Sequence, residues 1–361
     1  MRRRTAPNLK IPGRIRAGVV AFVAVALVAA PGASGQRGDA RAPSLTLAWL
    51  APTPADGATF RIAVGERLAV RVAAGGGRSA ARIWASGLPA GAALATSAGA
   101  RATGEVTWTP RRTQIGTHVF VVAAAVAGRQ AATAPRAIFV NVVPATPPMG
   151  NDVVPIGTNG VYRWAYLLHA TVARSQPRTT ARVVTRLGAY TSGDFVNLVL
   201  LIARARDAKG NTWYRVRLPI LPNGSTGWVS GDALTTTRAV TTYLVVFRKL
   251  FTATLYRGGH PVFRTRVGVG KPYWPTPSGD FYIREVVTDY NDPFYGPVAF
   301  GTSARSAVLT DWPGGGVVGI HGTSSPWLLP GRVSHGCVRI KNAELLRLFR
   351  LMPLGTPLAI R

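Results

Sequence analysis

The chain has 361 residues, enough for two or three domains that each bury a core of their own. Its Gly and Pro content and the scarcity of long helical periodicities predict a mainly β fold. The formal net charge of +29 comes mainly from arginines dispersed along the chain, which favours an acidic polymer or a membrane surface as the environment. Because no nucleic-acid-binding motif accompanies this charge, nucleic acid is not expected as a partner.

Residues 1–35 have the layout of an export signal. Six basic residues lie among the first sixteen, an apolar run spans residues 17–30, and small residues follow at 31–35. The run is shorter than the about twenty residues that span a bilayer, which favours a cleaved signal peptide over a retained signal anchor. Either form predicts an exported protein, and only a retained segment would hold the chain on a membrane.

Residues 36–47 are expected to form a linker, and residues 48–144 a β-sandwich. Valine- and alanine-rich runs alternate with turns in this region, which is typical of sandwich strands, at 61–64, 67–73, 106–109 and 118–126. The segments Gly87–Gly91 and Gly104–Pro110, followed by Gly116-Thr117-His118, resemble a bacterial immunoglobulin-like domain. The resemblance implies a spacer or binding module, with Trp108 in the core and His118 as an ordinary strand residue.

A second linker is expected at residues 145–160, where Pro, Gly and Asn are frequent, and a second domain at 161–236. The expected strands of this domain lie at 181–186, 196–203 and 213–218. Trp213–Arg217, followed by Gly227-Trp228-Val229, resembles the end of a bacterial SH3-like domain. Such domains are small barrels that often hold peptidoglycan or peptides, so a binding face and a purely structural barrel both remain open.

A third domain is expected at residues 239–361. Its predicted strands lie at 242–247, 250–256, 262–269, 281–287, 317–320 and 356–360. Arg257–His260 reads as a hairpin turn with His260 at the surface. Tyr290, Phe294 and Tyr295 fall in a loop that can cover a site. The sequence also predicts a short C-terminal helix at 343–352, with Asn342 as its N-cap and Leu345, Leu346 and Phe349 as its apolar face.

The only cysteine of the chain, Cys337, lies in this third domain between two histidines and a glycine. One cysteine cannot form an internal disulfide, so in an exported protein it is an intermolecular linker or a reactive thiol, and the second fits better. A thiol reacts as thiolate, which an imidazolium and converging backbone N–H groups can stabilise. We predict His321 or His335 as the base and the N–H groups of Gly336 and Cys337 as an oxyanion hole. A buried, inert cysteine is the alternative.

These residues resemble a known active-site signature. Ser334-His335-Gly336-Cys337 and Arg339, with His321 sixteen residues before the cysteine, look like the signature of the L,D-transpeptidase catalytic domain. Thr276–Phe281 also looks like the T-P-x-G-x-F segment of that family. The resemblance covers about the last third of the chain and implies a β-rich catalytic domain in the cell wall or at the outer face of the cytoplasmic membrane.

The resemblance implies that the cysteine attacks the amide between the third and fourth residues of a peptidoglycan stem. Terminal D-alanine leaves, and the amine of a neighbouring stem resolves the thioester into a 3-to-3 crosslink, a step in wall biogenesis that maintains cell shape. His321 is the implied base, with His335 second. Ser334 and Arg339 support geometry, and Arg339 can also meet a substrate carboxylate. Gly322 stands where the family often has a polar residue, so the group that orients His321 is left open.

Neither a metal ion nor another cofactor is expected. His321, His335 and Cys337 would make a trio of zinc ligands, but carboxylates nearby are few, and no acidic pair suggests a glycosidase. The expected partners are peptidoglycan stem peptides and, through the positive charge, anionic cell-wall polymers. The alternatives are an L,D-carboxypeptidase, in which water replaces the acceptor amine, another cysteine acyltransferase acting on peptidoglycan peptides, and a non-catalytic wall-binding protein.

Overall fold

The computed structural model describes residues 47–76, 79–126, 132–145, 153–288, 292–309 and 316–361. Strands dominate these residues and α1 (Asn342–Leu351) is their single α-helix, so the mainly β prediction is confirmed. Residues 45–361 form one compact unit. The predicted export signal lies outside the described residues, among which no helix has the length and apolarity needed to cross a membrane.

The first region packs two four-stranded sheets against each other. One sheet has the order β1-β3-β6-β5 and consists of Ala48–Leu50, Leu68–Gly75, Arg101–Trp108 and Ala93–Ser97. The other has the order β2-β8-β7-β4 and consists of Thr59–Ala63, Arg136–Val143, Gly116–Val126 and Ala81–Ser86. Buried and exposed positions alternate in β6, so one face of that strand joins the core, where Trp108 is buried as predicted. The region is thus a β-sandwich, and its immunoglobulin-like character remains a prediction.

The second region is an eight-stranded sheet whose main order is β12-β11-β15-β14-β13-β10-β16, with β9 paired to β13. In chain order, β9 to β16 are Val154–Pro155, Tyr162–Tyr166, Thr171–Arg174, Val183–Leu187, Leu198–Arg206, Thr212–Arg217, Thr226–Ser230 and Arg238–Val240. Buried residues of β10 to β15 share one core. The SH3-like assignment remains a prediction, and β16 pairs with β10 at the predicted boundary to the third domain.

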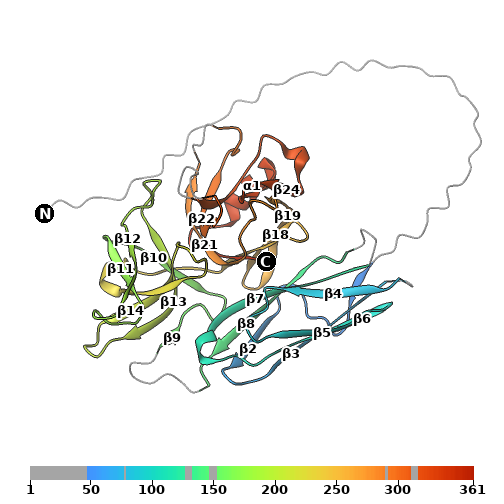
Figure 1. Ribbon diagram of the computed structural model, residues 1–361, viewed down its shortest axis with the longest axis horizontal. Coiled ribbons are helices and arrows are strands. Elements are labelled where there is room, and N and C mark those ends of the chain that lie inside the picture. The colour runs from blue at the N-terminus through green and yellow to red at the C-terminus, as the bar shows by residue number, and fades with distance from the viewer. Residues whose placement is uncertain (1–46, 77–78, 127–131, 146–152, 289–291, 310–315) are drawn as a thin grey trace, which may run out of the picture. The chain divides into compact units, whose positions relative to one another are not determined.

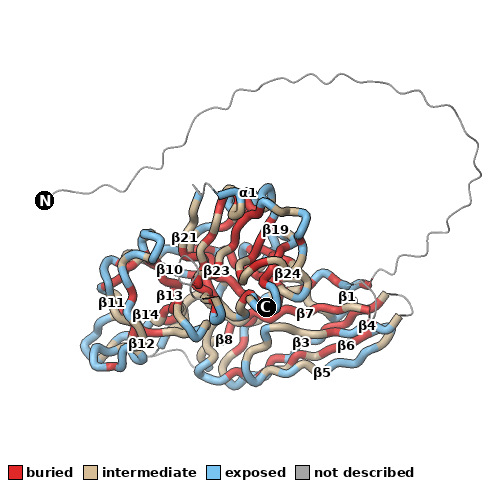
Figure 2. The backbone as a smooth tube through the Cα atoms, turned by 45° about the horizontal axis from the view of Figure 1, so that its top comes forward, coloured by how far each residue is buried: buried red, intermediate tan, exposed pale blue. Residues whose placement is uncertain are grey.

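The third region is a ten-stranded sheet with the order β19-β18-β17-β26-β21-β22-β23-β25-β20-β24. Figure 1 labels β18, β19, β21, β22, β24 and α1 of this region. In chain order, β17 to β26 are Thr242–Phe247, Thr252–Arg257, His260–Arg266, Gly268–Gly270, Gly279–Val287, Ala299–Arg305, Val317–His321, Gly331–Ser334, Val338–Arg339 and Pro357–Ile360. Buried residues of β17 and α1 belong to one hydrophobic core, and Figure 2 shows buried segments of this region in red near β23. The hairpin turn at Gly258-Gly259 and the exposed His260 are as predicted.

Two predicted elements differ from the structure. The strand expected at 262–269 ends at Arg266, and β20 then pairs with β24 and β25 instead of β18. The helix takes Lys341 as its N-cap, so Asn342 is already helical and its side chain is used elsewhere. Leu345 and Leu348 are its buried residues, because positions three residues apart lie on the same face of a helix, whereas Leu346 and Phe349 are exposed.

Side chains connect the three regions within the compact unit. Nε of the C-terminal Arg361 donates to the carbonyl of Val119 in β7 at 2.7 Å, and its guanidinium pairs with Asp280 in β21. The hydroxyl of Tyr282 in β21 donates to the carbonyl of Leu198 in β13 at 3.2 Å. Both contacts are buried and join strands far apart in the sequence, so the third sheet packs on both preceding regions.

Candidate active site

Two adjacent parallel strands bring the cysteine and one histidine together. β23 pairs with β25 in the register Ile320 to Val338 and His321 to Arg339. One residue before the Ile320–Val338 pair, the same register places Cys337 beside Gly319. Val318 and Ile320 are buried in the core, which fixes β23 against its neighbours. The fifteen residues between His321 and Cys337 therefore return the chain to the next strand, and they include β24 (Gly331–Ser334).

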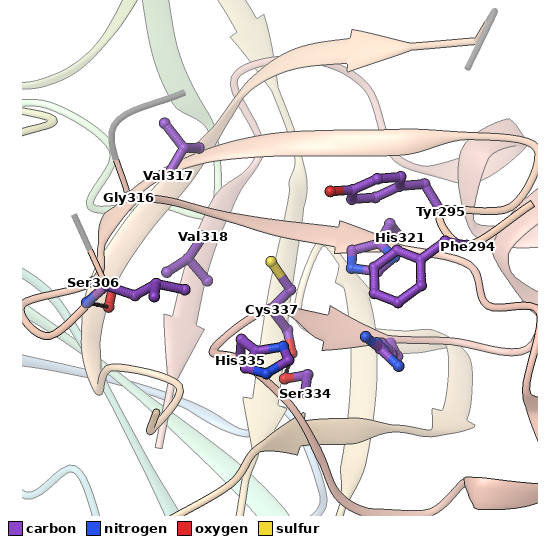
Figure 3. Close-up of a pocket in the computed structure, with 12 residues that line it drawn as sticks. Phe294, Tyr295, Ser306, Gly316, Val317, Val318, His321, Ser334, His335 and Cys337 are labelled. Carbon is purple, nitrogen blue, oxygen red and sulfur yellow. Dashed lines mark hydrogen bonds between the residues drawn. The ribbon is translucent and has the colours of Figure 1, made fainter. Parts of the chain in front are cut away.

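The sulfur of Cys337 faces β23. The N–H of Gly319 donates to Sγ at 3.4 Å. Figure 3 shows the sulfur directed toward the strand that carries Val318 and His321 and away from the ring of His335. A Cβ built on Gly319 would lie 3.9 Å from Sγ and 4.0 Å from Cδ2 of His321, so thiol and imidazole flank the same glycine. No sequence motif indicated this role for Gly319.

His321 is held as a neutral imidazole with one defined tautomer. Its ring is 3% exposed, and Nδ1 lies 2.8 Å from the carbonyl of Gly322, to which it donates. The other nitrogen, Nε2, then carries the lone pair. Burial is the main cause that lowers the pKa of His321 to about 4, and the nearby Arg339 lowers it further. The ring is therefore available as a proton acceptor at neutral pH.

The carbonyl of Gly322 is itself fixed from two sides. The N–H of Gly322 donates to the carbonyl of Tyr295 at 2.7 Å, and Oδ1 of Asn342 accepts from the N–H of Thr323 at 2.9 Å. A Cβ on Gly322 would lie 2.2 Å from that same Oδ1, so only glycine fits here. The orienting group that the sequence left open is thus the backbone, with Asn342 behind it.

Burial keeps the Cys337 thiol protonated in this structure. It raises the pKa of Cys337, although the N–H of Gly319 and the charge of Arg339 act in the opposite direction. The sequence reasoning expected the pKa to be lowered by an imidazolium, which the neutral His321 does not supply. The packed interior around the two side chains disfavours the charged form of each.

Ser334 closes the turn that precedes the nucleophile. Its Oγ donates to the carbonyl of Cys337 at 2.5 Å and accepts from the N–H of Gly336 at 3.1 Å. Gly336 has a φ of +123°, a conformation that side chains rarely adopt. The N–H of Gly336 therefore already has an acceptor in Ser334. The oxyanion hole formed by the N–H groups of Gly336 and Cys337 stays a prediction.

Thr276 ties the T-P-x-G-x-F segment to this turn. Its buried hydroxyl donates to the carbonyl of Gly336 at 2.7 Å and accepts from the N–H of Gly270 at 2.8 Å. The sequence singled out the segment by resemblance alone, whereas the structure gives Thr276 a contact with the residue before the cysteine.

Replacing Thr276 with valine, which has nearly the same shape, is expected to lower the free energy of unfolding by about 2 kcal/mol. The reason is that two buried backbone groups lose their partner. Chemical denaturation measures the effect. Thr265→Val is the control, because its hydroxyl makes one exposed bond of 3.3 Å, and it should stay within about 0.5 kcal/mol of the parent. Equal effects of both variants would contradict the role of Thr276.

His335 and Arg339 occupy different sides of the cysteine. The ring of His335 packs edge-on against Trp274, with centroids 4.4 Å apart, which suits a residue that shapes the turn. The guanidinium of Arg339 lies 4.4 Å from the centroid of Phe294, and its Nε is buried with no hydrogen-bond partner among the described residues. A buried, incompletely bonded guanidinium is suited to binding a carboxylate.

The cysteine and the two histidines line one narrow pocket of about 30 Å³ (Figure 3). Cys337, His321, His335, Ser334 and Arg339 form one part of its wall, and Phe294 and Tyr295 stand over His321 as the sequence predicted for a covering loop. Tyr290, the third aromatic of that prediction, lies outside the described residues. Within the part of the chain that the structure describes, no three His, Cys, Asp or Glu side chains converge as metal ligands.

Lowering the pH from 7 to 4.5 is expected to cost the folded chain about 2–3 kcal/mol through His321. The unfolded chain binds a proton at an imidazole of pKa 6.5, whereas folded His321 stays neutral until about pH 4, so stability falls as the pH passes from 6.5 to 4. His118 also has a lowered pKa but is present in parent and variant alike. Denaturation at both pH values should show a smaller loss for His321→Gln, and equal losses would contradict the buried neutral ring.

Comparison with known proteins identifies the third region. Residues 241–360 match the family model of the L,D-transpeptidase catalytic domain, which confirms the resemblance inferred for the last third of the chain. L,D-transpeptidase 1 of Mycobacterium tuberculosis is 28% identical over 145 residues, covering 37% of this chain and 53% of that protein. YkuD of Bacillus subtilis, described as a candidate L,D-transpeptidase, is 32% identical over 94 residues, covering 26% of this chain and 50% of that protein.

Solved structures give matches of the same kind. The catalytic domain of the Enterococcus faecium L,D-transpeptidase is 27% identical, with a TM-score of 0.25, and the match covers 33% of this chain and 96% of that one. L,D-transpeptidase 3 of Mycobacterium tuberculosis is 13% identical, with a TM-score of 0.29, covering 42% and 91%. The chain spans about half the length of the curated relatives it matches.

Proposed function

We propose that the chain is an exported peptidoglycan L,D-transpeptidase that forms 3-to-3 crosslinks through an acyl-enzyme on Cys337. One observation carries the proposal: Cys337 and His321 flank Gly319 on neighbouring strands, and the Nδ1 contact with Gly322 leaves Nε2 of His321 as a proton acceptor. The match of residues 241–360 to the catalytic-domain family supports the same reading. A buried, inert cysteine would need neither the pocket nor this tautomer.

The first half-reaction forms the thioester. As Sγ of Cys337 attacks the carbonyl carbon between the third and fourth residues of the donor stem, the thiol proton passes to Nε2 of His321. Because burial disfavours both charges at rest, deprotonation of the thiol accompanies the attack. The C–N bond then breaks, and the imidazolium returns its proton to the amine of the departing D-alanine.

The second half-reaction reverses these roles. The side-chain amine of the third residue on a neighbouring stem attacks the thioester, and His321 accepts its proton. The sulfur leaves as thiolate and is reprotonated, which completes the 3-to-3 link with no net change in the enzyme. Two donors are suited to the charges of these steps, the N–H of Cys337 for the oxyanion and Arg339 for a substrate carboxylate.

Substrate and location follow from the same proposal. The partners are peptidoglycan stem peptides, and the chain acts in the cell wall or at the outer face of the cytoplasmic membrane. Its net charge of +29 favours attraction to anionic wall polymers. No cofactor is assigned to the reaction, because the proposed steps need only a nucleophile, a base and hydrogen-bond donors.

Incubating the protein with tetrapeptide-bearing wall fragments tests the proposal, with the products read by mass spectrometry. The expected products are a 3-to-3 dimer and free D-alanine in equal amounts. Trimmed tripeptides without dimer would assign the alternative L,D-carboxypeptidase activity, in which water resolves the thioester. If the fragments remain unchanged although the protein is folded, the chain is a non-catalytic wall-binding protein and the proposal is overturned.

A further inference from the structure

A second cavity lies where strands of the three β-regions meet within the compact unit. It has a volume of about 180 Å³ and shares no lining residue with the Cys337 pocket. Its walls come from β7 in the first region, β10, β13 and β14 in the second, and β17 and β21 in the third. The proposed reaction does not use this cavity, and the packing of the sheets does not explain it.

Two tyrosines contribute to the cavity wall. Tyr162 is 8% exposed and Tyr243 is 5% exposed, and their rings contact each other edge-on with centroids 5.3 Å apart. Burial raises the pKa of both phenols, so each remains a protonated donor. A phenol hydroxyl in a cavity wall can donate a hydrogen bond to an acceptor bound there.

Positive charge in the same wall is only partly neutralised. Nε of Arg215 donates to Oγ1 of Thr226 at 3.0 Å, and no carboxylate of the described residues forms an ion pair with Arg215. Arg217 lies 3.7 Å from Asp280, whose other oxygen is bound by Arg361. Burial and the neighbouring charge of Arg217 lower the pKa of Arg215, as expected for two cations that face one space.

We propose that this cavity binds a small oxyanion group, a carboxylate or a phosphate, through the hydroxyls of Tyr162 and Tyr243 and the guanidinium groups of Arg215 and Arg217. A wall that offers hydroxyl and guanidinium donors with excess positive charge selects acceptor oxygens and negative charge. The phosphate of an acidic wall polymer and the carboxylate of a stem peptide share this chemistry. The site is independent of the assignment of Cys337, since no residue of that pocket takes part.

Calorimetric titration of the full chain with inorganic phosphate, and separately with acetate, tests this site at constant ionic strength. We expect saturable binding of one oxyanion per chain and a thermal midpoint that rises with its concentration. Binding of phosphate alone would assign a phosphate group as the ligand, and binding of acetate alone a carboxylate. The double variant Tyr162→Phe with Tyr243→Phe removes only the two hydroxyls and should weaken binding at least about 10-fold.

Arg215→Gln is the second test variant, in case the double variant does not fold, and should weaken binding by at least the same factor. Arg163→Gln is the matched control, because Arg163 is exposed on β10 next to Tyr162 and its loss changes the net charge equally. The control is expected to bind as the parent does. Absence of saturable binding, or equal weakening by Arg163→Gln and Arg215→Gln, would overturn the proposal.

Discussion

Replacing Cys337 with serine is expected to lower the transfer rate by at least about 10³-fold while the fold is retained. Serine keeps the shape and can still accept from Gly319, but the buried neutral His321 has to remove a proton from a much weaker acid. Dimer formation from wall fragments measures the rate, and circular dichroism and the thermal midpoint report the fold. A rate within tenfold of the parent would show that another group is the nucleophile.

Replacing His321 with glutamine is expected to lower kcat/KM by about 10²–10⁴-fold, the usual contribution of a general base. In the parent, the acid limb of the pH profile should lie near pH 4 instead of 6.5, because His321 protonates only there. The pH profile of the variant should lack this acid limb. A purely structural effect of the substitution would lower kcat/KM and leave the limb in place.

His335→Gln is the matched comparison for this prediction. The ring of His335 packs on Trp274 and the sulfur points away from it, so we expect a loss below about tenfold and an unchanged acid limb. If His335→Gln removed the limb and His321→Gln retained it, the two histidines would exchange roles.

The local chemistry of the site could be predicted because its residues are neighbours in the sequence. Ser334 to Cys337 form one turn, and the positive φ of Gly336 explains why a glycine precedes the nucleophile. The strand that ends at His321 was also predictable, since its apolar residues mark a buried strand. These features need no knowledge of the rest of the fold.

Contacts between distant strands could not be predicted in this way. Gly319 meets the sulfur only because β23 and β25 pair in one particular register, and Thr276 reaches Gly336 across sixty residues. Asparagine is common at helix N-caps, but the N-cap of this helix is Lys341, one residue earlier. Oδ1 of Asn342 instead accepts a hydrogen bond from the N–H of Thr323. Each contact depends on sheet topology, on which a single sequence is silent.

The protonation states of His321 and Cys337 depend on how deeply the fold buries them, which cannot be read from the sequence. A histidine near a cysteine suggests an ion pair, but the packing around His321 and Cys337 favours the neutral form of both. The N–H of Gly336 donates to Ser334 within the turn, a contact that the sequence alone does not show. Five of the predicted site residues line one pocket: Cys337, His321, His335, Ser334 and Arg339.

The central claim is that the sulfur of Cys337 captures an acyl group, and a carbapenem adduct tests it most directly. Opening of the lactam leaves no separate leaving group, so the thioester persists and can be located by mass spectrometry of the intact protein and its peptides. We predict one adduct per chain, on the peptide that carries Cys337, absent from Cys337→Ala and slow to form in His321→Gln. An adduct on any other peptide while Cys337 stays unmodified would contradict the account.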